Sequence, residues 1–334
     1  MIGDSLAPIL LSMNSTSADI LYPVLEGTSR SFYLGIQSLE QPEKDAICLG
    51  YLFCRFLDLF EDASDVSVDS RVSILAALQS WCEDIDSLER LEKVLALQSE
   101  FQDEFAGYFE KVPSEKELYK VSKTLLREIE LLPPNLKNIF PESLIPMFEG
   151  MRSEIRASAT PRCRSVEEFD DYCFAVAGTV GHFLSKVFLE AKAFPEGVDR
   201  DVLLEQGEAF GRALQTVNIV KDFHKDWEER RCFWPLLEGY SFEGPKPSED
   251  VLLAILKQLY EKFLRDLERA EHYVALIDSK RPDIKFFCEF PLQMAVKNMD
   301  LAMKDTAWLR NGDSPKVPRE ETMALIDALS SSVA

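Results

Sequence analysis

Two groups of carboxylate side chains carry the most chemical information in this sequence. The first holds Asp58, Glu61 and Asp62, and the second holds Asp222 and Asp226, well over a hundred residues later. Both groups lie in segments that we predict to be helical, and residues three or four positions apart on a helix share a face. Carboxylates held this close repel one another, and burial strengthens the repulsion. The pattern indicates a bound cation, and Mg²⁺ with a phosphate-bearing substrate is the natural candidate because Mg²⁺ prefers carboxylate and phosphate oxygens.

The sequence around these groups favours a binding site over an ordinary charged helix face. The chain holds 58 Asp and Glu residues among 334, so a solvated acidic helix is the common explanation for such spacing. However, the first group follows the apolar run 47–54, and the second follows the mostly apolar run 213–220. Carboxylates at the ends of buried helices are costly unless they are paired or bound to a metal. We therefore interpret both groups as Mg²⁺ ligands.

Basic side chains flank both acidic groups. Arg55 lies three residues before Asp58, so that it can contact both a carboxylate and a phosphate. Lys221 and Arg231 bracket the second group, and Ser29-Arg30-Ser31 places a cation and two hydroxyl groups at a predicted helix start, where backbone N–H groups also attract anions. Any one of these residues would be an ordinary surface ion pair, but together they match a Mg²⁺–diphosphate site.

Aromatic side chains point to an apolar cavity beside these charges. Tyr172 places one phenol in the apolar segment 172–178, and a buried tyrosine often does no more than hydrogen-bond a neighbour. We leave that alternative open. Together with Tyr51, Phe287 and Phe290, however, Tyr172 predicts a pocket that excludes water and offers aromatic faces to a hydrocarbon carbocation.

Composition predicts an all-α protein and limits its partners. Hydrophobic residues make up 46% of the chain, glycine is scarce at 14 residues, and apolar positions recur every three or four residues with little strand-like alternation. The net charge of −21 excludes nucleic acid as a partner, because a phosphate backbone requires a basic surface. An anionic substrate must then be held by local cations and metal ions. The seven cysteines show no CxxC pairing and indicate a reduced, cytoplasmic protein.

The chain shows no convincing linker, and we predict one domain over residues 1–334. We expect no signal peptide, and we find no apolar run that approaches the ~20 residues a membrane-spanning helix needs. Within the helix predicted over 169–188, Gly178 and Gly181 should let a neighbouring helix approach closely. The other helices that should carry the site span residues 19–38, 44–62, 201–227 and 286–304.

The order of these pieces resembles the squalene/phytoene synthase family, and its squalene-forming branch in particular. One DxxxD pair is weak evidence, but the matching segments follow the family's order from residue 29 to about residue 295, which is most of the chain. These segments are Ser29 to Phe32; Arg55 to Asp58 with Glu61 and Asp62; Tyr172-Cys173 with Val176 to Gly178; Gln215 with Asn218 to Asp222 and Asp226; Arg231 with Phe233 to Pro235; and Phe287-Cys288 with Pro291, Met294 and Ala295.

This resemblance implies the all-α isoprenoid synthase fold, a helical bundle around a central apolar cavity. It implies a Mg²⁺-dependent head-to-head condensation of two farnesyl diphosphates to presqualene diphosphate, followed by NADPH-dependent rearrangement and reduction to squalene. We further expect a cytoplasmic monomer without a transmembrane anchor, which touches a membrane surface when it delivers its apolar product.

The resemblance also implies a role for each residue that matches the family's motifs. Asp58, Glu61 and Asp62 would bind Mg²⁺ at one diphosphate, and Asp222 and Asp226 at the other. Tyr172 would help to quench the first cation and transfer its proton, and Arg55 would complete the catalytic set. The residues that would hold phosphate or cofactor are Arg30, Arg55, Lys221, Lys316 and Arg319, and those that would hold the substrate are Ser29, Arg30, Ser31, Phe32, Tyr51, Gln215, Asn218, Arg231 and Phe287.

Departures from the family's pattern concern the NADPH step. Phe174 and Lys221 stand where the family often has His and Arg, and His224-Lys225 replaces a more usual Leu-Glu. Lysine cannot make the bidentate phosphate contact of arginine, and without a GxGxxG segment any NADPH site would not be of the Rossmann type. The alternatives are a synthase that makes presqualene diphosphate, hydroxysqualene, dehydrosqualene or phytoene, or a non-catalytic all-α module that binds isoprenoids or a partner helix.

Overall fold

The structure is a computed structural model that describes residues 13–157, 165–235, 246–312 and 314–331, without the side chains of Arg30, Ser31, Ser330 and Ser331. Throughout this described part the regular elements are helices, which confirms the predicted all-α class. In chain order they are α1 (Ser15–Thr28), α2 (Arg30–Ser38), α3 (Glu43–Asp62), α4 (Val68–Glu83), α5 (Leu88–Phe101), η1 (Gln102–Phe105), α6 (Ala106–Lys111), α7 (Pro113–Leu131), α8 (Pro134–Lys137), α9 (Ile139–Ala157), α10 (Val166–Cys173), η2 (Phe174–Gly178), α11 (Thr179–Glu190), α12 (Arg200–Glu228), α13 (Glu249–Ala275), α14 (Pro282–Lys304), α15 (Trp308–Asn311) and α16 (Arg319–Ser331).

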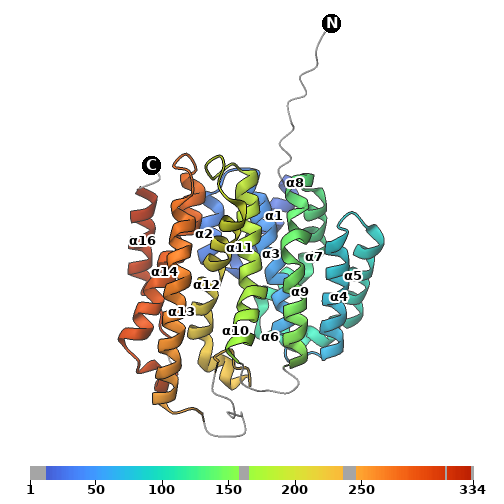
Figure 1. Ribbon diagram of the computed structural model, residues 1–334. Coiled ribbons are helices and arrows are strands. Elements are labelled where there is room, and N and C mark those ends of the chain that lie inside the picture. Colours follow the sequence, from blue (N-terminus) through green and yellow to red (C-terminus); the bar gives the residue numbers. More distant parts are fainter. Residues whose placement is uncertain (1–12, 158–164, 236–245, 313, 332–334) are drawn as a thin grey trace.

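The long helices stand side by side, from α5 on one flank to α16 on the other (Figure 1). Helix α12 packs against α11, α13 and α14, and helix α3 packs against α4, α7 and α9. Behind α3, the ring of Phe53 meets those of Trp81, Phe140 and Phe148 edge to face, and all four side chains are buried. This aromatic core fixes one side of α3 and leaves another side of the helix to form a wall of the cavity described below.

Glycines let the stretch around α11 approach α12 closely. A Cβ atom on Gly181 would lie 1.9 Å from the carbonyl oxygen of Gly207, and one on Gly178 would lie 2.9 Å from Cγ of Glu208. No larger residue fits at Gly181 without moving a backbone, since real Cβ atoms do not approach oxygen so closely. The close approach that the sequence predicts at these two glycines is therefore confirmed.

The single helix predicted over residues 19–38 is wrong, because the chain breaks at Ser29, but the helix start predicted at Ser29-Arg30-Ser31 is confirmed. Helix α1 ends at Thr28, and α2 begins at Arg30. Ser29 is extended, with φ −156° and ψ 113°, and its Oγ accepts a hydrogen bond from the N–H of Phe32 at 3.3 Å. A serine in this position caps the second helix, and the break sets Ser29 and Phe32 against the cavity.

The stretch Val166–Glu190 also differs from a simple helix. Its middle, η2, is a π-turn in which the N–H of Thr179 reaches the carbonyl oxygen of Phe174, and such turns are frequent at functional sites. This stretch is long and apolar enough to cross a membrane, with a mean hydropathy of 1.3 over its best window, which corrects the expectation that no run qualifies. However, 61% of that window is buried inside the molecule, as in the core helix of a globular protein.

Candidate functional site

A cavity of about 680 Å³ lies between α2, α3, α12, α14 and the stretch from α10 to α11. Its volume falls within the usual range of ligand pockets, about 300–1,000 Å³. Along α3 the lining residues are apolar near Ile47 and Gly50 and acidic from Asp58 onward. Along α12 they change in the same way, from Phe210 to Asp222. The cavity therefore has an apolar end and an acidic end.

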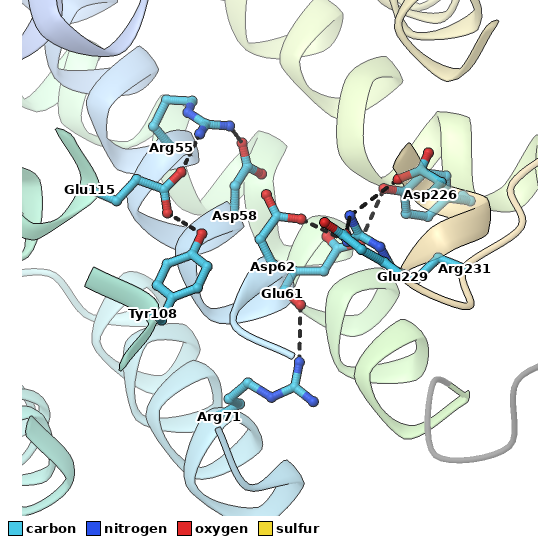
Figure 2. Close-up of polar contacts among 11 residues, drawn as sticks. Arg55, Asp58, Glu61, Asp62, Arg71, Tyr108, Glu115, Asp226, Glu229 and Arg231 are labelled. Carbon is cyan, nitrogen blue, oxygen red and sulfur yellow. Dashed lines mark hydrogen bonds and ion pairs between the residues drawn. The ribbon is translucent and has the colours of Figure 1, made fainter. Parts of the chain in front are cut away.

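Each carboxylate of the first acidic group has a different partner. Asp58 accepts a hydrogen bond from Arg55 at 2.8 Å, Asp62 accepts one from Arg231 at 2.8 Å (Figure 2), and Glu61 accepts one from the Tyr172 hydroxyl at 3.1 Å. Burial raises the pKa of Asp58 to about 6, and burial together with the charges of Asp62 and Asp58 raises the pKa of Glu61 to about 8. These shifts mark a place where a further cation would be stabilised.

Arg55 is held from behind by α6 and α7. Its Nη2 donates to Oε1 of Glu115 at 2.7 Å, and the hydroxyl of Tyr108 donates to the other oxygen of the same carboxylate (Figure 2). Glu115 is 4% exposed. Because Asp58 and Glu115 bind the two ends of the guanidinium, Arg55 has a fixed orientation at the cavity wall.

The chain turns back directly after α12, so that Arg231 faces the acidic end. Arg230 has a positive φ of 58°, which few residues other than glycine adopt, and the N–H of Arg231 donates to the carbonyl oxygen of Asp226 at 2.7 Å. The Arg231 side chain donates to Asp62 at 2.8 Å, to Asp226 at 3.2 Å and to Glu229 at 2.7 Å (Figure 2). Burial raises the pKa of Asp226 to about 7. The two acidic groups therefore meet at one place, joined by a guanidinium.

Tyr172 lies beside this junction. Its ring stacks on Phe233 at 4.6 Å between centroids, and the guanidinium carbon of Arg231 lies 5.7 Å from the Phe233 centroid. Because its hydroxyl donates a hydrogen bond to Glu61, the phenol lies at the boundary between the acidic end and the apolar walls of the cavity.

Most of the predicted site residues line this one cavity. The side chains of Arg30 and Ser31 lie outside the described residues. Phe290 is not among the lining residues, which corrects the sequence-based expectation, because its ring stacks on Phe286 at 6.0 Å instead. The lining residues that were predicted are Ser29, Phe32, Tyr51, Arg55, Asp58, Glu61, Asp62, Tyr172, Gln215, Asn218, Lys221, Asp222, Asp226, Arg231 and Phe287.

The late basic pair does not line the cavity. Lys316 and Arg319 are exposed. Their segment is nevertheless attached to two residues that line the cavity, Lys221 and Asn298. The Ser314 hydroxyl donates a hydrogen bond to the carbonyl oxygen of Lys221 at 2.5 Å, and the N–H of Val317 donates one to the Asn298 side chain at 3.4 Å. This location fits a cofactor phosphate held outside the cavity, next to its wall.

His224, one of the departures from the family's pattern, points away from the cavity. The side chain is 6% exposed, and its Nε2 lies 2.8 Å from the carbonyl oxygen of Trp308. Its ring also meets that of Trp308 edge to face at 6.0 Å. This histidine therefore packs α12 against α15 and leaves the cavity-facing carboxylates unchanged.

The donor set fits Mg²⁺ that is shared with a phosphate. Five carboxylates line the cavity, and hard oxygen ligands are those that Mg²⁺ prefers. Among the described residues, no three Asp, Glu, His or Cys side chains are gathered closely enough to hold an ion by themselves. Mg²⁺ is usually bound by one or two carboxylates together with water and substrate phosphates, so this spacing fits an ion completed by a diphosphate.

The support behind Arg55 was not predicted from the sequence. Glu115 lies in the first turn of α7, just after Pro113, where acidic residues are common because they favour a helix start. Tyr108 lies in a short helix of the preceding segment. Neither position shows a local signal, since the contact that gives Glu115 its role comes from α3, sixty residues earlier.

Comparison with known proteins gives one family. A sequence model of that family, described as squalene/phytoene synthase, matches residues 25–321. Over 292 residues the chain is 26% identical to the squalene synthase of Mus musculus, and the match covers 85% of this chain and 64% of the mouse protein. The chain therefore spans slightly less than two thirds of the length of that relative.

Solved structures show the same fold. The structure of TcSQS in complex with a ligand matches with a TM-score of 0.74 at 21% identity, covering 96% of this chain and 90% of that one. A dehydrosqualene synthase in complex with a ligand matches with a TM-score of 0.56 at 17% identity, covering 95% and 96%. The all-α isoprenoid synthase fold implied by the sequence is thereby confirmed.

Proposed function

This chain belongs to the squalene/phytoene synthase family, and we propose that it condenses two farnesyl diphosphates head to head to presqualene diphosphate and then reduces that intermediate to squalene with NADPH. The family consists of prenyltransferase-type enzymes, so the chain is an enzyme. The name of the mouse relative, a squalene synthase, supports squalene as the product.

One observation carries this proposal. Two acidic groups from α3 and α12 meet at one end of a cavity whose other walls are apolar and aromatic. A diphosphate suits the acidic end when Mg²⁺ lies between the carboxylates and the phosphate oxygens, and a prenyl chain suits the apolar walls. A non-catalytic module that only binds isoprenoids has no need for such an end.

Ionisation of an allylic diphosphate leaves negative charge on the departing oxygens. Bound Mg²⁺ would supply the main neutralisation of that charge, held by Asp58 and Asp62 on one side and by Asp222 and Asp226 on the other. Arg55 is already oriented at this wall by two carboxylates. We propose that its guanidinium, with Arg231 and Lys221, binds the phosphate oxygens.

The carbocation that remains would be protected by the apolar walls. The ring of Phe32 lies 5.3 Å from that of Tyr51 and 6.5 Å from that of Phe287, and all three line the cavity. Their faces stabilise positive charge and exclude water. The Tyr172 hydroxyl, which already donates to Glu61, would help to quench the first cation and transfer its proton.

The NADPH step depends on the segment that follows α15. Ser314 and Val317 attach this segment to Lys221 and Asn298, two residues of the cavity wall. This attachment supports a cofactor site next to the cavity. The alternative is a product that needs no NADPH, such as dehydrosqualene, the product in the name of one structural neighbour.

Incubation of the purified protein with farnesyl diphosphate and Mg²⁺, with and without NADPH, tests this function. We expect squalene with NADPH, presqualene diphosphate or a more oxidised hydrocarbon without it, and no diphosphate release when EDTA removes the metal. The same hydrocarbon in both reactions would reject the reductive step. Absence of diphosphate release in all reactions would reject the synthase itself.

A further inference from the structure

Arg231 contacts both acidic groups at the same time. Its Nη1 lies 2.8 Å from Oδ1 of Asp62, and its Nη2 lies 3.2 Å from Oδ1 of Asp226. The Arg231 side chain is only 12% exposed, and that of Asp226 only 10%. The guanidinium thus neutralises two carboxylates, from α3 and α12, that would otherwise repel each other across the acidic end.

A guanidinium at this place competes with a divalent cation. Mg²⁺ binds carboxylate oxygens directly, at about 2.0–2.1 Å, and Arg231 occupies one oxygen of Asp62 and one of Asp226. Two cations between the same two carboxylates would also repel each other. Full coordination of a metal by Asp62 and Asp226 therefore requires the guanidinium to move.

The surroundings of Arg231 offer a second position for its side chain. Glu229 accepts a hydrogen bond from Nη2 at 2.7 Å, and its side chain is 38% exposed, on the solvent side of the junction. The backbone N–H of Arg231 is fixed to Asp226, and Phe233 lies next to the guanidinium. The side chain can leave the two aspartates while its backbone stays in place and one carboxylate still balances its charge.

We propose that Arg231 is an exchangeable internal cation, which holds Asp62 and Asp226 together in the substrate-free enzyme and transfers to the diphosphate when Mg²⁺ takes those two carboxylates. This inference rests on the proposed function and adds to it a coupling between the binding of Mg²⁺ and the binding of the diphosphate. Mg²⁺ alone must displace a cation, whereas Mg²⁺ with a diphosphate gives that cation a new partner. Metal and diphosphate therefore bind more tightly together than separately.

Replacement of Arg231 should change two affinities in opposite directions. Isothermal titration calorimetry of Arg231→Gln with Mg²⁺ alone should show binding on the order of tenfold tighter than in the wild type, because the internal competitor is gone. Titration with inorganic pyrophosphate at saturating Mg²⁺ should show binding on the order of tenfold weaker, because a phosphate ligand is gone. A residue that only stabilised the fold would not give opposite signs.

Arg212→Gln is the matched control. Arg212 also lies among three carboxylates, with its side chain 18% exposed, but it does not line the cavity. Its replacement should leave both affinities unchanged, and Arg231→Lys, which keeps the charge, should lie between wild type and Arg231→Gln. Circular dichroism shows that each variant is folded before titration.

The outcomes separate this inference from the proposed function. If the wild type binds Mg²⁺ and Arg231→Gln binds it no more tightly, the exchange is wrong while the metal site stands. If neither protein binds Mg²⁺ or pyrophosphate, both the exchange and the diphosphate site are wrong.

Discussion

Arg212 in α12 and Arg231 just after its end are each surrounded by three carboxylates, but the two regions differ in charge balance. Arg212 pairs with Glu208 at 3.2 Å, with Asp170 at 3.4 Å and with Asp266 at 3.8 Å. Lys262 adds a second cation on Asp170 at 2.5 Å. In this region the positive and negative side chains nearly balance, and the group joins α10, α12 and α13.

Around Arg231 the acids exceed the cations by two, against one around Arg212. The six acids are Asp58, Glu61, Asp62, Asp222, Asp226 and Glu229, and the four cations are Arg55, Lys221, Lys225 and Arg231. The carboxylates of both acidic groups and Glu229 lie near the cavity's acidic end, and burial raises the pKa of Asp58, Glu61 and Asp226. In the Arg212 region burial also raises the pKa of Asp266, while a hydrogen bond from His182 helps to lower the pKa of Glu208. We expect the nearly balanced group to stabilise the fold by itself, and the more acidic group, which lines the cavity, to be completed by a ligand. The place of one group at the cavity, together with its larger excess of acids, distinguishes the candidate site from structural charge.

The largest expected effect comes from removing one carboxylate in each region. Asp222→Asn should lower the rate of diphosphate release by about 10³-fold, because it removes a contact that stabilises the departing charge. Asp266→Asn, the control in the Arg212 region, should leave the rate of the folded enzyme unchanged and lower the free energy of unfolding by about 1–2 kcal/mol. Single-turnover diphosphate release and urea unfolding measure the two effects. Equal rate losses in both variants would show that the two regions do not differ in function.

Tyr172→Phe should have the next largest effect. The phenyl ring can keep its stacking on Phe233, so the fold should be retained, but the hydroxyl on Glu61 is lost. We expect turnover to fall by about 10²-fold, as for the loss of a proton-transferring group, and hydrocarbon products to change when analysed by gas chromatography. A wild-type rate and product would show that the phenol only bonds its neighbour.

A smaller effect is expected from the support of Arg55. Tyr108→Phe removes the hydroxyl that holds Glu115, and we expect about tenfold lower kcat/KM because a loss of ~1.4 kcal/mol in positioning corresponds to that factor. Tyr119→Phe is the control, since Tyr119 is equally buried but donates to the Gln98 carbonyl oxygen away from Arg55. Both variants should lose similar unfolding free energy. Equal kcat/KM in the two variants would contradict the positioning role.

The smallest effect concerns pH and metal-free stability. Asp58, Glu61 and Asp226 have folded-state pKa values of about 6, 8 and 7, above those of an unfolded chain, so the folded protein binds more protons. Their contribution to stability is complete below about pH 4 and is lost as the pH rises through 6 to 8. We expect the thermal midpoint in EDTA to fall across this window, and Mg²⁺ to reduce the fall because it stabilises the charged carboxylates. An identical pH profile with Mg²⁺ would contradict metal binding there.

Local signals were enough to predict the parts of the site that lie within single helices. In α3 the apolar residues recur with a helical period, and Asp58, Glu61 and Asp62 lie close together in the sequence, so both features can be read from adjacent residues. The predicted helix over 44–62 matches α3 within a residue. The roles assigned to these residues stay predictions. That Arg231 turns back onto Asp62 could not be derived from spacing, because it depends on the left-handed backbone at Arg230.

Contacts between distant segments account for what was missed. The helix start at Ser29 could be predicted because serine is a good helix cap, but the end of α1 just before it could not, because the apolar period continues across it. Phe290 faces Phe286 and not the cavity, since the packing of neighbouring helices decides which side of α14 faces inward. Glu115 and Tyr108 support Arg55 only because α6 and α7 fold against α3.

The π-turn at Phe174–Gly178 sets the rotation of Tyr172 relative to α11. An ordinary α-helix turns by about 100° per residue. The one additional residue in η2 therefore rotates α10, which carries Tyr172, by about that angle relative to α11. Gly181 of α11 stays in close contact with α12. Deleting a single residue here would restore a regular helix, keep the tight seam between α11 and α12, and swing the phenol away from Glu61. Insertions and deletions in this short segment should thus separate the Tyr172 hydroxyl from Glu61 while leaving the rest of the bundle assembled.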